Sequence, residues 1–174
     1  MFRYQLLIEY EGTYFRGWQI QKKGKTIQGT LQEKISKFLK EKIVINGSGR
    51  TDTGVHALAQ SAHFDCKNII KDKDRFLKSI NYFLNNSKIS ILDLKKKNFK
   101  FHARFSAKER VYQYIILNRL ASSPLSENRK WHIIKKLDVP LMKKAAKKLE
   151  GIKDFSTFRA STCNAKNPIR TMKS

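Results

Sequence analysis

The stretch Phe2-Arg3-Tyr4-Gln5-Leu6-Leu7-Ile8-Glu9-Tyr10 places an apolar side chain at every second position. Such alternation is typical of a β-strand with one face in the core and the other toward solvent. We therefore expect the chain to enter a sheet almost at its first residue. Because this strand begins so early, we also expect no signal peptide.

Two amphipathic helices and several further strands are predicted downstream. Thr26 can cap a first helix whose apolar residues recur at helical spacing, namely Ile27, Leu31, Ile35, Phe38 and Leu39. A second helix begins near Asp72 or Asp74 and carries the apolar residues Phe76, Leu77, Ile80, Phe83 and Leu84. Strands are predicted at residues 43–45 and 58–64, and again around Ile89 and Ile91. The order strand-helix-strand-strand-helix-strand predicts an α+β domain of the ferredoxin-like, split βαβ type over residues 1–100.

A second domain is predicted to begin after residue 100. Residues 95–98, Lys-Lys-Lys-Asn, are interpreted as a linker or a solvated turn, and residues 111–117 as a strand with Tyr112 and Tyr114 on one face. Asp138 can cap a helix that carries Pro140 in its first turn, apolar residues from Leu141 to Leu149, and Gly151 as its stop. Residues 101–174 therefore predict an α/β domain that is begun but incomplete.

The charge of the chain favours a polyanionic partner. Of its 174 residues, 37 are Lys or Arg and 14 are Asp or Glu, which gives a formal net charge of +23. The electrostatic field of such a positive charge attracts RNA, DNA or an anionic membrane surface, because neutralised phosphates release counterions. A lysine-rich compositional bias explains part of the charge, but the scarcity of acidic residues favours nucleic acid.

Other compositional features narrow the class of protein. Cys66 and Cys163 are too few and too far apart for a disulfide scaffold or a zinc site, so we expect both to be reduced in a cytosolic protein. No apolar run approaches the length of about 18 residues that a membrane span needs, and no membrane association is expected.

The segment from Gly47 to Ala57, Gly-Ser-Gly-Arg-Thr-Asp-Thr-Gly-Val-His-Ala, carries Asp52 close to Arg50 in a loop flanked by glycines. It is not a phosphate-binding P-loop, because Gly54 is followed by Val and His rather than by Lys and a hydroxyl residue. The dinucleotide fingerprint fails as well, since its third glycine would fall on Asp52. A lone carboxylate in a basic chain can act on a bound polyanion as a nucleophile or a base. The simpler interpretation is that Asp52 caps the next turn and Arg50 forms a surface ion pair.

Six segments in a fixed order carry a resemblance to a known family. They are residues 10–21 (Tyr-Glu-Gly-Thr-Tyr-Phe-Arg-Gly-Trp-Gln-Ile-Gln), 26–29 (Thr-Ile-Gln-Gly), 50–57 (Arg-Thr-Asp-Thr-Gly-Val-His-Ala), 101–107 with 112–114 (Phe-His-Ala-Arg-Phe-Ser-Ala and Tyr-Gln-Tyr), 154–158 (Asp-Phe-Ser-Thr-Phe) and 169–171 (Ile-Arg-Thr). Together they resemble the TruA family of tRNA pseudouridine synthases. Glu11 stands where that family usually has Asp, and Thr53 where a small or basic residue is commoner.

The resemblance implies a pseudouridine synthase fold, with a mixed, mainly antiparallel sheet and helices on one face. It aligns Asp52 with the catalytic aspartate, Tyr112 with the tyrosine that stacks on the target base, and Arg50 with the arginine that helps to extrude the target nucleotide. It further implies isomerisation of uridine in the anticodon stem-loop of tRNA by a cytoplasmic homodimer that needs no cofactor and no metal. The histidines lack metal-ligand spacing and are interpreted as packing or solvated side chains: His56, His63, His102 and His132.

One departure from the family leaves an alternative open. Family members continue past the position of residue 174, and their later segment supplies further strands and a basic residue that pairs with the aspartate. We therefore expect a truncated product, a fragment or an incomplete sequence. The main alternative is a catalytically impaired RNA-binding remnant of the same family. A basic ribosome-associated or nucleic-acid-packaging protein would explain the charge, but neither Asp52 nor the ordered segments.

Overall fold

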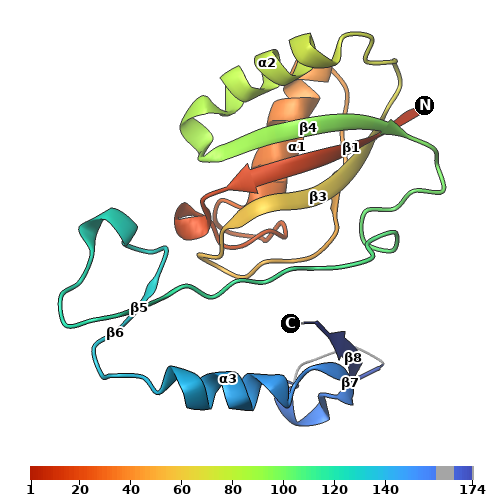
Figure 1. Ribbon diagram of the computed structural model, residues 1–174. Helices are drawn as coiled ribbons and strands as arrows, with labels where there is room; N and C mark the ends of the chain where they lie inside the picture. The colour runs from red at the N-terminus through yellow and green to blue at the C-terminus, as the bar shows by residue number, and fades with distance from the viewer. Residues whose placement is uncertain (160–166, 174) are drawn as a thin grey trace. The chain divides into compact units, whose positions relative to one another are not determined.

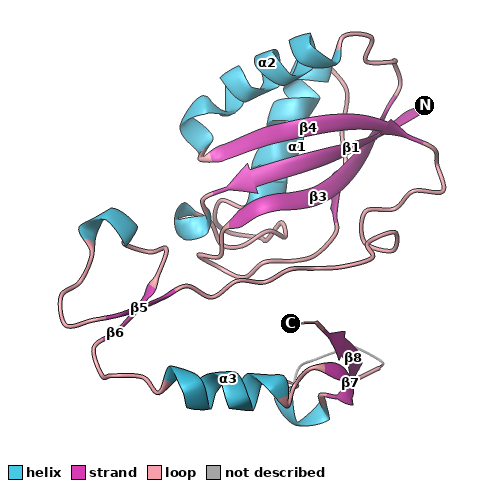
Figure 2. Ribbon diagram, viewed as in Figure 1, coloured by secondary structure: helices cyan, strands magenta, loops and turns pink. Residues whose placement is uncertain are grey.

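A computed structural model describes residues 1–159 and 167–173 of the chain. The chain divides into two units (Figure 1). Unit 1 comprises Met1–Ile115 with Ser126–Arg129, and unit 2 comprises Ile116–Leu125 with Lys130–Ser174. Both units contain helices and strands (Figure 2), so the fold class is α+β as predicted.

Unit 1 is built on a four-stranded antiparallel sheet. Its strands are β1 (Phe2–Tyr10), β2 (Asn46–Gly47), β3 (Ala57–Cys66) and β4 (Ile89–Lys97). They lie in the order β2-β3-β1-β4, and all neighbouring pairs are antiparallel. The predicted first strand is therefore confirmed, and it lies inside the sheet with β3 on one side and β4 on the other (Figure 2).

The core of unit 1 lies between one face of this sheet and two helices. Alternate residues of β1 are buried, as their spacing predicts: Tyr4, Leu6, Ile8 and Tyr10. They form one apolar cluster with the buried residues of α1 (Ile27–Leu39) and α2 (Lys73–Leu84). The helices meet at Phe38 and Phe76, whose ring centroids are 5.5 Å apart. Burying such rings supplies much of the stability of a small α+β unit.

The predicted helix starts are confirmed. The Thr26 side chain accepts a hydrogen bond from Gly29 N–H at 3.2 Å, and Asp72 accepts one from Arg75 N–H at 2.8 Å. Asp72 is thus the cap of α2, and Asp74 lies in its first turn. Each cap satisfies a backbone N–H that has no partner within the helix.

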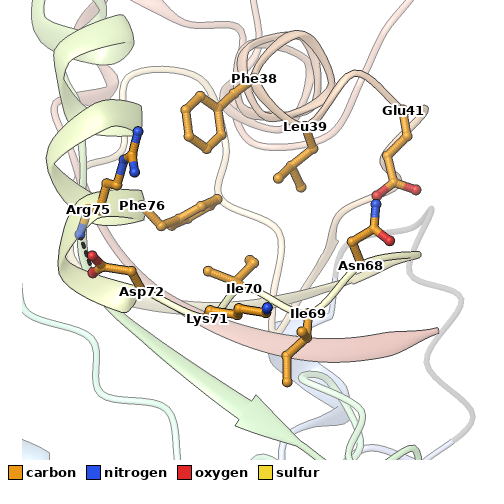
Figure 3. Close-up of a pocket in the computed structure, with 10 residues that line it drawn as sticks. All are labelled: Phe38, Leu39, Glu41, Asn68, Ile69, Ile70, Lys71, Asp72, Arg75 and Phe76. Carbon is orange, nitrogen blue, oxygen red and sulfur yellow. Dashed lines mark hydrogen bonds between the residues drawn. The ribbon is translucent and has the colours of Figure 1, made fainter.

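Near the end of α1 and the start of α2, a small cavity of about 230 Å³ is lined by residues of both helices and of the loop before α2 (Figure 3).

Two local predictions in unit 1 are wrong. Residues 43–45 form no strand, because the N–H groups of Ile43 and Ile45 donate to the side chains of Ser36 and Gln32, at 2.9 and 3.0 Å. The paired strand begins only at Asn46. Lys95–Lys97 are not a linker but the end of β4, paired with Gln5, Tyr4 and Arg3. β4 is an edge strand, where lysines are common because they discourage pairing with another chain.

Unit 2 contains two small sheets and one helix. β5 (Ile116–Asn118) pairs in parallel with β6 (Trp131–Ile133), and β7 (Gly151–Asp154) pairs antiparallel with β8 (Ile169–Met172). The predicted strand over residues 111–117 is wrong over most of its length, because pairing begins at Ile116. Residues 111–115 have no strand partner in the described part of the chain. The strands β6, β7 and β8 were not predicted.

The third helix, α3 (Val139–Lys147), starts where the sequence predicts. Asp138 accepts a hydrogen bond from Leu141 N–H at 2.9 Å, and Pro140 lies in the first turn. The helix ends at Lys147, earlier than the Gly151 stop suggests. None of its residues is buried, so its predicted apolar residues, among them Leu141 at 61% exposure, lie open to solvent. None of the described helices is long and apolar enough to cross a membrane.

Candidate active site

Asp52 lies in the loop that joins β2 to β3. This loop reaches the end of β1, because Tyr10, the last residue of β1, pairs with Ala57, the first residue of β3. In Figure 1 the start of β3 accordingly lies beside the end of β1. The segment after β1, with the short 3-10 turn Gly12–Tyr14, therefore faces the Asp52 loop.

The backbone next to Asp52 is fixed by that segment. Trp18 N–H donates to Thr51 O at 3.0 Å, and the Tyr10 hydroxyl shares a 2.9 Å hydrogen bond with the Thr51 hydroxyl. Val55 N–H donates to Asp52 O at 3.2 Å and closes a turn. Tyr10 and Trp18 are buried, at 3% and 1% exposure, so they form a rigid support for the loop.

Two glycines permit the close approach between the two segments. A Cβ on Gly12 would lie 2.0 Å from Val55 O, and a Cβ on Gly17 would lie 2.5 Å from Thr51 O. Gly17 also has a φ of +76°, in the left-handed region that favours glycine. Both glycines belong to the segment 10–21, so this segment sets the shape of the Asp52 loop.

The other end of the loop is held by two long side chains. Gln60 donates to Gly49 O at 2.7 Å, and Arg110 donates to Ser48 O from Nε at 3.3 Å and from Nη2 at 2.8 Å. Arg110 Nη2 also donates to Arg104 O at 3.2 Å. Arg110 therefore ties the loop to the segment 101–107. The sequence pattern did not single out Gln60, Arg110 or Tyr10 for this role.

The segment 101–107 is itself anchored to the open face of the sheet. Arg3 donates to the carbonyl oxygens of Phe99 and Phe101, at 2.9 and 2.8 Å, and to both carboxylate oxygens of Asp65. That pairing lowers the pKa of Asp65 below its usual value. The buried His63 accepts from Ala103 N–H at 3.1 Å, and burial lowers the pKa of His63 to about 4.

The side chains of Asp52 and Arg50, in contrast, take no part in this network among the described residues. Both are exposed, and within the described residues neither forms a hydrogen bond or an ion pair. Within the described residues, the structure therefore shows neither the surface ion pair of Arg50 nor the capping of the following turn by the Asp52 side chain. The backbone is fixed while the carboxylate and the guanidinium remain open to a ligand.

Tyr112 is not brought onto the loop. Its side chain is 72% exposed, and over residues 1–159 and 167–173 no hydrogen bond or ring contact ties it to Asp52 or Arg50. Tyr112 lies two residues after Arg110, whose side chain bonds to Ser48 O in the loop. The backbone at Tyr112 is therefore only two positions from a point of attachment to the loop.

The histidine side chains form hydrogen bonds with backbone groups. His56 contacts Gly12 N and Asn128 O, and His132 contacts Arg119 O. In the described part of the chain, no group of three or more His, Cys, Asp or Glu side chains could hold a metal ion. None of the residues that line the cavity of Figure 3 belongs to the Asp52 loop. The candidate site is thus an exposed loop with one carboxylate and one guanidinium, able to act on a nucleic acid that the positive charge attracts.

Comparison with known proteins points to one family. The profile of the tRNA pseudouridine synthase family matches residues 6–106. The chain is 67% identical over 174 residues to a tRNA pseudouridine synthase A of Pelagibacter ubique, covering all of this chain and 71% of that protein. Proteins of the same name from Anaplasma phagocytophilum and Ehrlichia canis are 43% and 45% identical, over 99% and 98% of this chain and 70% and 69% of their own lengths.

Proposed function

The chain belongs to the tRNA pseudouridine synthase family, and on that premise we propose that it isomerises uridine to pseudouridine in the anticodon stem-loop of tRNA, with Asp52 as the catalytic residue. One observation supports this assignment above the others. Asp52 is an exposed carboxylate without a protein partner among the described residues, on a loop whose backbone is hydrogen-bonded on both sides. Such a group is ready to meet a substrate in a fixed position.

The reaction suits a single carboxylate. The bond between N1 of uracil and C1′ of the ribose breaks, and a bond between C5 and C1′ forms. The hydrogen on C5 is lost as a proton, and N1 gains one, so the product is an isomer of the substrate and nothing is oxidised or reduced. The Asp52 carboxylate can add to the sugar or to the base, or remove a proton from the sugar.

The target base must leave the helical stack before it can reach Asp52, at a cost of a few kcal/mol. We propose that Arg50, exposed two residues before Asp52, helps to extrude the nucleotide by occupying its place or holding its phosphate. We propose that Tyr112, whose ring is free of the core, stacks on the flipped base. The net charge of +23 supplies the attraction for the tRNA backbone.

The finer assignments belong to the same proposal. The strand order β2-β3-β1-β4, with helices after β1 and β3, supports a ferredoxin-like, split βαβ architecture for unit 1. We also propose a cytoplasmic protein that works as a homodimer without a cofactor, and that unit 2 belongs to a second domain.

The alternative is an RNA-binding chain without turnover. It is favoured by the absence, within the described residues, of a basic side chain paired with Asp52. A carboxylate without such a partner lacks one means of setting its orientation and its charge.

Asp52→Asn separates the two functions. Asn is nearly isosteric, but it is neither a nucleophile nor a base near neutral pH. We expect tritium release from 5-tritiated uridine in tRNA to be abolished, while tRNA affinity stays within a few fold because phosphate contacts dominate binding. Asp74→Asn, an exposed carboxylate on α2, is the matched control and should leave both unchanged. Turnover that survives in Asp52→Asn would exclude Asp52 from the chemistry, and tRNA binding without turnover in the wild type would favour the alternative.

A further inference from the structure

His56 joins the Asp52 turn to two other segments of unit 1. Its Nδ1 lies 3.1 Å from the backbone nitrogen of Gly12, and its Nε2 lies 2.8 Å from the carbonyl oxygen of Asn128. Because a backbone N–H only donates, Nδ1 must present a lone pair, and because a carbonyl only accepts, Nε2 must carry the hydrogen. The two contacts together select the neutral imidazole with its hydrogen on Nε2.

This side chain is placed to fix the backbone on the C-terminal side of Asp52. Val55 N–H closes the turn onto Asp52 O at 3.2 Å, and His56 is the next residue. The backbone of Gly12 packs against the same turn so closely that a Cβ there would lie 2.0 Å from Val55 O. The Gly12–His56 hydrogen bond therefore joins the two segments at a point where their backbones are in close contact.

We propose that His56 is a positioning residue of the reaction: its neutral Nε2–H form holds the Asp52 turn between Gly12 and Asn128, and a proton on Nδ1 releases the turn from Gly12. The proposal rests on the proposed function of Asp52. Protonation turns Nδ1 from an acceptor into a donor that faces the Gly12 N–H, while the bond from Nε2 to Asn128 survives. The turnover number, kcat, should then depend on the charge of His56, although His56 does not touch the reacting atoms.

The surroundings of His56 carry charges of both signs. Glu11, beside Gly12, lies 3.6 Å from Arg129 and 4.0 Å from Lys88. The charged residues on the elements around His56 are Glu11, Lys88, Glu127, Arg129 and, in its own turn, Asp52. Protonation of the ring at acid pH should lower kcat of the wild-type chain, because the charged imidazole offers the Gly12 N–H no acceptor.

Two substitutions test the two hydrogen bonds of the His56 ring separately. His56→Asn places an amide oxygen near the position of Nδ1, so it retains an acceptor for Gly12 and cannot titrate. His56→Gln places an amide nitrogen near the position of Nε2, so it retains a donor to Asn128 and leaves Gly12 without its acceptor. The full chain carries each substitution, and kcat and KM for tRNA are measured across the pH range. His132→Gln, whose Nε2 contacts Arg119 O in unit 2, is the control and should behave as the wild type.

We expect His56→Asn to keep kcat near the wild-type value around pH 8 and to lose less of it than the wild type at acid pH. We expect His56→Gln to lower kcat roughly ten- to hundred-fold at every pH, the range that a small misplacement of a catalytic group produces. KM should change little in either variant, because phosphate contacts dominate binding. Unchanged kcat in His56→Gln, or the same acid fall in His56→Asn as in the wild type, would overturn the proposal.

A measurement without turnover keeps this result distinct from the proposed function. Nitrogen NMR of the full chain near pH 8 should show the neutral Nε2–H imidazole of His56. The amide of Gly12 should be protected from hydrogen exchange in the wild type and in His56→Asn, and lose protection in His56→Gln. A ring with its hydrogen on Nδ1, or equal protection in both variants, would contradict the positioning role. A wild-type chain that forms no pseudouridine but shows the predicted NMR and exchange would contradict the proposed function alone.

Discussion

At the scale of single residues, the site contains two kinds of side chain. Some bond to the Asp52 loop and fix its backbone, and others extend from the loop into solvent. Tyr10, Gln60 and Arg110 bond to backbone or hydroxyl groups of the loop, and Tyr10 is buried. Asp52 and Arg50 remain exposed between these attachments. A reacting carboxylate gains from this division, because its position is set before the substrate binds and little order has to be created during the reaction.

Tyr112 and Tyr114 test the stacking proposal as a matched pair. Both rings are exposed, at 72% and 88%, so neither substitution removes core packing. Tyr112→Ala should lose about 1–3 kcal/mol of base stacking, seen as a fall in kcat/KM, whereas Tyr112→Phe retains the ring and most of the activity. Tyr114→Ala should have no comparable effect. Equal losses in the two alanine variants would show that Tyr112 has no special place at the base.

His63 predicts a pH dependence of stability. Burial, strengthened by the positive charge of Arg3, lowers the pKa of His63 to about 4 from 6.5. Between these values the unfolded chain binds a proton that the folded chain does not. The contribution of His63 to the free energy of unfolding should therefore be fully present above pH 6.5 and be lost, up to about 3 kcal/mol, as the pH drops toward 4.

Urea unfolding across this range measures the effect. His63→Asn keeps an acceptor for Ala103 N–H without a titrating ring, so its stability should depend less on pH in this window. A variant with the full wild-type slope would assign the pH dependence to other groups.

At the scale of elements, the segment after β1 shapes the loop before β3. Its glycines lie against the backbone of that loop, and its buried Trp18 donates to Thr51. Gly47, at the end of β2, continues the same packing, since a Cβ there would lie 2.6 Å from the Trp18 ring. The two segments therefore pack against each other along their length, although Trp18 and Gly47 are 29 positions apart in the sequence.

Gly17→Ala should damage activity more than stability. The new methyl group would meet Thr51 O at 2.5 Å, so the backbone beside Asp52 must move. Gly24→Ala is the control, because Gly24 shares the positive φ, at +92°, but its Cβ would meet only the flexible Arg16 side chain. Both should lose about 1–2 kcal/mol of stability for the left-handed backbone, but only Gly17→Ala should lower kcat by an order of magnitude or more. Similar kcat values in both would show that the loop tolerates displacement.

At the scale of the whole molecule, the two units differ in how much they bury. Unit 1 has a continuous apolar core, whereas the described strands β7 and β8 and helix α3 of unit 2 contain no buried residue. Hydrophobic burial is the main source of local stability, so the two units should not resist unfolding equally. The exposed apolar residues of α3 also favour association with another chain or segment.

Hydrogen exchange measured by mass spectrometry should reveal this difference. Amides of α1 should exchange only through global unfolding, because Ile27, Leu31 and Ile35 are fully buried. Amides of α3 should exchange orders of magnitude faster in the dilute chain. Protection of α3 that rises with protein concentration would indicate that self-association covers its apolar residues. Equal and strong protection of both helices in dilute solution would contradict the prediction.

The sequence by itself determined the features that depend on near neighbours. The alternation in residues 2–10 and the capping residues Thr26, Asp72 and Asp138 act over a few residues, and the structure confirms each of them. The ordered segments likewise pointed to the family that the comparisons show. These signals can be read because periodicity and capping are local properties of the chain.

Only the tertiary structure decided which groups meet across the chain. Ile43 and Ile45 are apolar, as a strand requires, but their N–H groups bond to side chains of α1 rather than to a neighbouring strand. His56 was interpreted as a packing or solvated side chain, yet it contacts residues 44 and 72 positions away. No local pattern specifies such contacts, because a hydrogen-bonding group takes the partner that the folded backbone places within reach, and that partner is set by the packing of distant segments.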